Sequence, residues 1–258
     1  MAIFDISLSQ LYTFFLIFLR VGAIMLVVPI FDSKNIPLMF KAGLSFSISI
    51  VLFPILKSDI HPVFAGIIPF GIGVAGEIIM GLIIGFSVRL IFAGVQLAGQ
   101  IAGFQMGFAI ANVIDPLSNA QVSIIAQLKN LVAMLIFLAI NAHHWFLRAL
   151  VESFRLVPPF DFQFSNSLMA QLVKLSCNMF IIAIQVGAPV MAALLLTSAA
   201  LGLIARTVPQ MHIFIVAMPL KIMVGLLFLA LSLPFLSAFL RQIFNGWGRD
   251  LFLLLRAM

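Results

Sequence analysis

Few side chains in this sequence could carry acid–base or metal chemistry, and they are widely spaced. His143 and His144 are adjacent, and neighbouring residues do not share a helix face, whereas a metal site needs ligands that converge. Glu77 and Asp115 lie 38 residues apart without a companion motif that would make them an acid–base pair. No nucleotide-binding glycine loop with its lysine occurs. We therefore expect no enzyme activity, no cofactor and no metal site.

The composition places the chain in a membrane. Of its 258 residues 64% are hydrophobic and 9% are charged, and the mean hydropathy is +1.25. Soluble domains carry about 25% charged residues. The apolar runs lack the alternation of strands, so an all-α polytopic membrane protein is expected. The net charge of +6 comes from scattered Lys and Arg residues, which excludes a nucleic-acid-binding stripe and favours contact with anionic membrane lipid.

The chain divides into apolar segments separated by polar or proline-containing turns. Pro54, Pro189, Pro219 and Pro234 lie in or near these segments and predict kinks. The lengths of the segments predict six or seven membrane crossings, followed by a short basic tail. The segments are Leu8–Pro29, Leu38–Leu56, Val63–Val88, Gly94–Leu128 with its continuation to Ala142, the amphipathic connection His143–Phe164, Leu168–Ile204 and Ile213–Leu240.

The stretch Gly94–Leu128 is long enough to cross a membrane but is poorly suited to facing lipid. Gly99, Gly103 and Gly107 recur every fourth residue, which predicts a helix face where another backbone can approach closely. Asp115-Pro116 then breaks the helix among polar residues. Such a break is tolerated at membrane depth against protein or a water-filled cavity. We interpret it as the functional element; the alternative is an ordinary polar loop between two spans.

Charged side chains within or beside the apolar segments indicate surroundings of protein or water. The charges expected to be buried are Arg20, Glu77 and Lys221, with Lys41 and Arg89 beside apolar segments. Each buried charge costs roughly 2.5–3.5 kcal/mol at the centre of a lipid-facing helix, whereas a Leu or Ile returns about 0.3–0.6 kcal/mol.

Phe104 and Met106 flank the glycines before the polar break and are candidates for a pore constriction.

The sequence AGQIAGFQMGFAIANVIDP (Ala98–Pro116), followed by a long apolar run and His143, resembles the flagellar biosynthetic protein FliR family. The opening FLIFLRVGAIMLVVPIF (Phe15–Phe31) matches that family at Arg20 and Pro29. The last third is similar to the two-helix hairpin of the partner subunit FliQ, at Ala188-Pro189, Gly202, Gln210, and Pro219 with Lys221. The resemblance implies kinked helical hairpins, with a FliP-like portion over residues 1–170 and a FliQ-like hairpin and basic tail over 171–258.

The resemblance further implies a subunit of the flagellar type III secretion export gate. Such a subunit joins FliP, FliQ and other export apparatus membrane proteins in the bacterial inner membrane, at the flagellar basal body. Unfolded flagellar proteins pass through the centre of this closed complex. The family's channel plug maps onto Gly107, Phe108, Ala109, Ile110, Ala111, Asn112, Val113, Ile114, Asp115, Pro116, Leu117 and Ser118.

Two other functions remain open at the level of sequence. An ion-coupled small-molecule transporter would use Glu77 or Asp115 with broken helices near the midplane. A purely structural assembly subunit would have no conducting role. An inverted sequence repeat would favour the transporter, and none is visible. Co-purification with FliP and FliQ would favour the gate.

Overall fold

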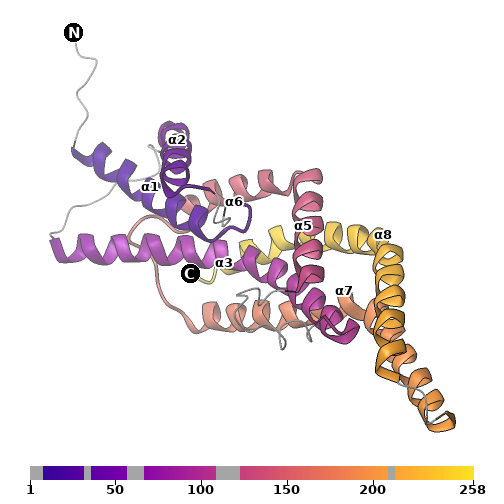
Figure 1. Cartoon of the computed structure of the whole chain (residues 1–258). Coiled ribbons are helices and arrows are strands. Elements are labelled where there is room, and N and C mark those ends of the chain that lie inside the picture. The colour runs from indigo at the N-terminus through magenta and orange to yellow at the C-terminus, as the bar shows by residue number, and fades with distance from the viewer. Residues whose placement is uncertain (1–7, 32–35, 57–66, 109–122, 209–212) are drawn as a thin grey trace. The chain divides into compact units, whose positions relative to one another are not determined.

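The computed structural model describes residues 8–31, 36–56, 67–108, 123–208 and 213–258. Helices account for most of these residues, and no strand occurs in these ranges. The expected all-α class is therefore confirmed. The helices, shown in Figure 1, are α1 (Leu8–Val27), α2 (Leu38–Leu56), α3 (Ile67–Met106), α5 (Ile124–Ala139), α6 (Ala142–Leu156), α7 (Asn166–Thr207) and α8 (Ile213–Leu255).

Five of the described helices, α1, α2, α3, α7 and α8, are long and apolar enough to cross a membrane. Helices α5 and α6 add a sixth span if they are counted as one broken crossing. The sequence predicted one more because it separated Val63–Val88 from the glycine-rich segment that follows. The structure joins the two in α3, since no proline or glycine lies between Arg89 and Gly94 to end the helix.

Three helices are much longer than a membrane span requires. Helices α3, α7 and α8 contain 40, 42 and 43 residues. At about 1.5 Å per residue each is roughly 60 Å long, twice the ~30 Å of bilayer hydrocarbon. Pro189, Pro219 and Pro234 lie inside α7 and α8 without ending them. A helix of this length that crosses the bilayer directly leaves about half of its residues outside the hydrocarbon.

The chain forms two compact units that alternate along the sequence. The first unit comprises residues 1–90, 141–176 and 246–258, and the second comprises 91–140 and 177–245. Both units therefore contain residues from each side of position 170. The division into a FliP-like portion and a FliQ-like portion rests on sequence resemblance, and it stays a prediction.

In the first unit α1 packs on α2 through aromatic rings. The ring of Phe46 lies 5.4 Å from that of Phe14 and 6.2 Å from that of Phe18, centroid to centroid.

In the same unit the last residues after α8 contact the segment before α7. The backbone N–H of Gln163 donates to the carbonyl oxygen of Met258 at 3.0 Å. The residues expected as a short basic tail thus continue α8 to Leu255 and are held against the segment before α7.

The second unit has an apolar core that joins the end of α3 to α5, α7 and α8. The buried side chains of the core are Ala102, Met106, Ile125, Val190, Leu194 and Leu229. Because this core includes residues of both α7 and α8, these two helices form a hairpin. In a separate aromatic contact of the same unit, the ring centroids of Phe92, Phe137 and Phe244 lie 5.0–5.7 Å apart.

The helices differ in how much of their surface the chain itself covers. In α3, 67% of the residues in the apolar window are buried, against 17% in α2 and 22% in α8. Of the five candidate spans, α3 is therefore the one that the chain itself covers most. Helices α2 and α8 present apolar side chains outward, where lipid or other subunits must cover them.

Candidate functional site

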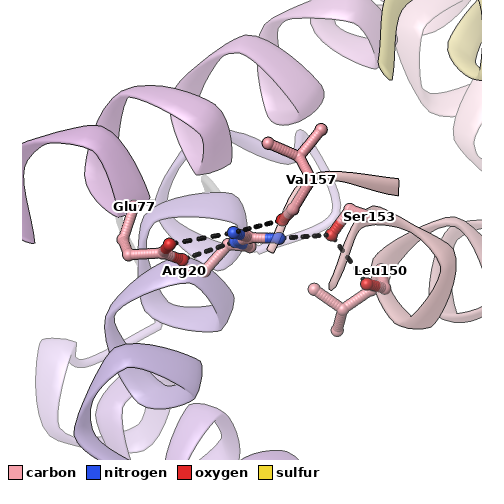
Figure 2. A network of polar contacts seen from close by, with 5 residues as sticks. All are labelled: Arg20, Glu77, Leu150, Ser153 and Val157. Carbon is pink, nitrogen blue, oxygen red and sulfur yellow. Dashed lines mark hydrogen bonds and ion pairs between the residues drawn. The ribbon is translucent and has the colours of Figure 1, made fainter. Parts of the chain in front are cut away.

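A buried ion pair links α1 to α3 in the first unit. The Arg20 Nε donates to Oε2 of Glu77 at 2.5 Å, and the Arg20 Nη2 donates to Oε1 at 2.9 Å. Both side chains have no exposed surface. Figure 2 shows the guanidinium and carboxylate facing each other in this bidentate arrangement. Two of the three charges expected to be buried, Arg20 and Glu77, thus neutralise each other.

The remaining donors of Arg20 bind α6 and the residue that follows it. Its Nη1 donates to Oγ of Ser153 at 3.3 Å, and its Nη2 donates to the carbonyl oxygen of Val157 at 3.1 Å (Figure 2). The Ser153 Oγ in turn donates to the Leu150 carbonyl at 2.7 Å. The Phe154 ring lies 4.0 Å from the Arg20 Cζ, at cation–π distance. One guanidinium therefore connects α1, α3 and α6.

This network is suited to holding helices and poorly suited to catalysis. A general acid or base needs to reach a substrate proton, and the Glu77 carboxylate is enclosed and fully engaged by Arg20. Removing one member of such a buried pair typically costs about 3–5 kcal/mol, because the other charge stays buried without a partner. We interpret Arg20–Glu77 as the structural centre of the first unit.

Two glycines bring α3 close enough to α1 for this pair to form. Glu77, Gly81 and Gly85 are spaced four residues apart and so share one face of α3. A Cβ at Gly81 would lie 2.6 Å from the Ala23 Cβ, and one at Gly85 would lie 2.7 Å from the Val27 Cβ. Real Cβ atoms do not approach so closely, so both positions require glycine. The Gly81/Gly85 spacing is visible in the sequence, although its partner helix is not.

The glycines expected to pack a helix meet a partner within this chain. A Cβ at Gly99 would lie 2.5 Å from the Ala126 Cα, and one at Gly103 would overlap the Ser123 side chain. Ser123 is the N-cap of α5, and its Oγ accepts a hydrogen bond from the Ile125 N–H at 3.3 Å. The start of α5 therefore covers this glycine face. Gly99 and Gly103 thus have close neighbours within this chain.

Helix α3 ends at Gly107 with a defined cap. Gly107 has φ +95°, a conformation that L side chains rarely adopt. Its N–H donates to the Phe104 carbonyl at 3.0 Å, and the Phe108 N–H donates to the Gly103 carbonyl at 3.1 Å. These two bonds form a Schellman motif, which ends a helix and redirects the chain. Gly107 and Phe108 are the first two residues of the expected plug; Ala109–Ser118 lie outside the described residues.

The two candidates for a pore constriction face different environments. The Phe104 side chain is 72% exposed, whereas Met106 is fully buried in the core of the second unit. A Cβ at Gly225 of α8 would overlap the Met106 side chain, so Met106 fills the space that this glycine leaves. Of these two candidates, Phe104 is the one whose side chain is exposed enough to line a channel in this conformation. Met106 instead holds the end of α3 against α8, and a constriction at either residue stays a prediction.

The structure also places a buried lysine that the sequence analysis did not single out. Lys129 of α5 is 2% exposed, and its Nζ donates to the Val186 carbonyl at 3.4 Å. In the sequence it stands between Gln127 and Asn130, a context typical of a solvent-facing turn. Its hydrogen-bond partner Val186 lies on the distant α7, so no local pattern could have found it. Lys221, by contrast, was expected to be buried and is partly exposed.

Proteins with similar sequences identify the family of this chain. The sequence model of bacterial export proteins, family 1, matches residues 11–247. The chain belongs to this family. It is 36% identical to the flagellar biosynthetic protein FliR of Bacillus subtilis (strain 168) over 241 residues, 90% of each chain. It is 31% identical to the FliR of Escherichia coli (strain K12), covering 92% of this chain and 90% of that protein.

A further relative is the FliR of Caulobacter vibrioides, 29% identical over 224 residues. The family match includes most of α1 with Arg20, all of α3 and most of α8. The expected resemblance is thereby confirmed over nearly the whole chain. This membrane protein is a component of the flagellar export apparatus, as membership of the export family and its FliR relatives indicate.

Proposed function

We propose that this chain is a subunit of the closed export gate, which it forms together with FliP and FliQ in the bacterial inner membrane at the flagellar basal body. Unfolded flagellar proteins pass through the channel of that complex. The observation that carries the proposal is the length of α3, α7 and α8, which are about twice as long as the bilayer hydrocarbon is thick. Helices of this kind have residues outside the hydrocarbon, where further subunits can contact them.

Exposed apolar side chains on α7 and α8 support an assembly. Leu196 and Leu203 of α7 are 73% and 69% exposed, and Ile215 and Met223 of α8 are 72% and 69% exposed. Exposed apolar surface on this scale marks contact with membrane or with other protein chains. A hairpin of two such helices has faces that further subunits can cover. FliQ, to which this hairpin is similar in sequence, is the partner that we assign to it.

The way in which α3 ends supports the proposal that the residues from Gly107 onward form a plug. Its final turns are held by the Gly103 contact with Ser123 and by Met106 in the core. The Schellman motif at Gly107 then ends the helix at a fixed point. The residues from Gly107 to Ser118 combine small, apolar and polar side chains with Pro116. We propose that this segment blocks the channel until a substrate arrives, with Phe104 at its edge.

The transporter alternative finds less support. It relied on Glu77 or Asp115 as the ion-coupling carboxylate. Glu77 is fully buried and accepts two hydrogen bonds from Arg20, so it has no access to an ion path in this conformation. Asp115 lies outside the described residues.

Co-purification tests the proposal. The chain is expressed with a tag together with FliP and FliQ, extracted in mild detergent and purified through the tag. The gate predicts one stable complex that contains all three proteins and elutes as a single peak. Purification of the chain as a stable monomer carrying a small solute, with FliP and FliQ left behind, would instead indicate a transporter.

A further inference from the structure

A groove between α1 and α2 in the first unit is lined almost entirely by apolar atoms. Its volume is about 310 Å³, at the lower end of the ~300–1,000 Å³ typical of ligand sites. Both helices are candidate membrane spans. The groove is lined by Phe18, Leu19, Gly22, Ala23 and Leu26 of α1, by Leu38, Lys41, Ala42 and Ser45 of α2, and by Ile78 of α3.

Only one polar group of the lining is available to a ligand. The Ser45 Oγ donates to the Lys41 carbonyl oxygen at 2.8 Å, so this hydroxyl is already engaged with its own helix. Lys41 is the one charged residue of the lining and is half-buried. No described residue forms a hydrogen bond or an ion pair with its ammonium group. The groove thus combines an apolar wall with a single cation.

We propose that this groove binds an anionic phospholipid, with an acyl chain along the apolar wall and the lipid phosphate on the Lys41 ammonium. Basic pockets between membrane helices bind anionic headgroups through this combination of charge and apolar surface. Lys41 is the fourth residue of α2, so its Cα lies only about 4.5 Å inside the start of the span. A lysine side chain there reaches headgroup level while its stem stays in the apolar region.

The size of the groove favours a lipid chain over a helix from another subunit. Along α1 the lining runs from Phe18 to Leu26, about 12 Å at 1.5 Å per residue. A helix of that length with its side chains is about 10 Å across and occupies roughly 900 Å³. This is more than twice the 310 Å³ that the groove offers. A single flexible hydrocarbon chain needs no such width.

Native mass spectrometry of the purified full chain, alone and in its complex, tests the site. Each sample is incubated with phosphatidylglycerol, which is anionic, or phosphatidylcholine, which is zwitterionic, and the bound lipids are counted. Lys41→Met deletes the charge and keeps the stem, and Lys174→Met is the matched control at an exposed lysine on α7. Gly22→Leu fills the groove, because a Cβ at Gly22 meets nothing within 4 Å.

We expect the unaltered chain and Lys174→Met to retain phosphatidylglycerol several-fold more than phosphatidylcholine. Lys41→Met should bind both lipids equally, and Gly22→Leu should lose one bound lipid of either kind. An unchanged lipid preference in Lys41→Met, or an unchanged lipid count in correctly eluting Gly22→Leu, would overturn the proposal. As a second measurement, a photo-crosslinker at Ala42 should label lipid in intact membranes. Labelling of a protein subunit instead would show that a partner occupies the groove.

Discussion

Arg20 of α1 and Glu77 of α3 stand 57 residues apart in the sequence and meet as a bidentate ion pair with no exposed surface. The glycines at 81 and 85 make this contact possible, because they let α3 approach the backbone of α1. The same guanidinium also holds Ser153 and Val157. A charge that would be unfavourable in lipid thus organises the protein interior of the first unit.

The first prediction concerns the balance of charge in this pair. Arg20→Met leaves the Glu77 carboxylate buried without its partner, which should lower the free energy of unfolding by about 3–5 kcal/mol. The double variant Arg20→Met/Glu77→Leu removes both charges and should recover most of that loss, since buried pairs can often be replaced by apolar residues. Thermal unfolding of the purified chain in detergent measures both effects. A double variant as unstable as Arg20→Met would show that shape or hydrogen bonding to α6, and not charge balance, is decisive.

The second prediction concerns the close approach of α3 to α1. Gly81→Ala places a methyl group 2.6 Å from the Ala23 Cβ and 2.7 Å from the Arg20 carbonyl oxygen, so backbone must move. Overpacking of this kind typically costs about 1–3 kcal/mol. Gly43→Ala on α2 is the matched control, because a Cβ there meets nothing within 4 Å and alanine favours helix. Equal unfolding temperatures for the two variants would contradict the close packing.

The third prediction concerns Lys129. Among the described residues, the buried Lys129 ammonium makes one long hydrogen bond, to the Val186 carbonyl, which compensates poorly for its lost hydration. Lys129→Met keeps most of the side-chain volume and should leave the thermal stability of the purified chain unchanged or raised. A clear loss of stability would mean that the ammonium has a strong partner beyond the described residues.

The all-α class and the main helices could be predicted from the sequence, because a helix that crosses a membrane needs a long, continuous run of apolar residues. Runs of about twenty apolar residues are visible without knowledge of any partner. The boundaries of α2 agree at both ends, Leu38 and Leu56. The length of α3 was missed because Arg89 looked like the end of a span, whereas the helix continues through three buried residues, Leu90, Ile91 and Phe92.

Which residues contact each other was harder to predict from the sequence than which residues are important. Arg20 and Glu77 were each recognised as costly in lipid, but only the fold brings them together. Gly99 and Gly103 were recognised as a packing face, yet their neighbours Ser123 and Ala126 follow the polar loop and could not be assigned from spacing. Contacts between segments distant in sequence depend on the whole fold, and a single sequence does not record them.

The fourth prediction concerns Lys221 of α8. It lies two residues after Pro219, which removes a backbone donor and can leave a carbonyl free nearby. Since Lys221 is partly exposed in the chain alone, its ammonium is available to a neighbouring subunit or to the channel mouth. Lys221→Met should reduce assembly with FliP and FliQ, or export, as scored by swimming in soft agar. Lys174→Met is the control, and normal swimming of Lys221→Met would mean that Lys221 only reaches toward the membrane surface.

The measurement that tests the central proposal most directly is the conductance of the assembled gate with and without its plug. Deleting residues 109–115 removes most of the segment that follows Gly107 while leaving α3, its cap and the start of α5 in place. A channel wide enough for a polypeptide must be blocked against ions when idle, so the loss of a plug opens it. In planar bilayers, the complex of the deletion variant with FliP and FliQ should show large, persistent single-channel currents, whereas the intact complex stays closed. Equal conductance of the two complexes, with assembly preserved, would contradict the plug and move the seal to Phe104 or to the partner subunits.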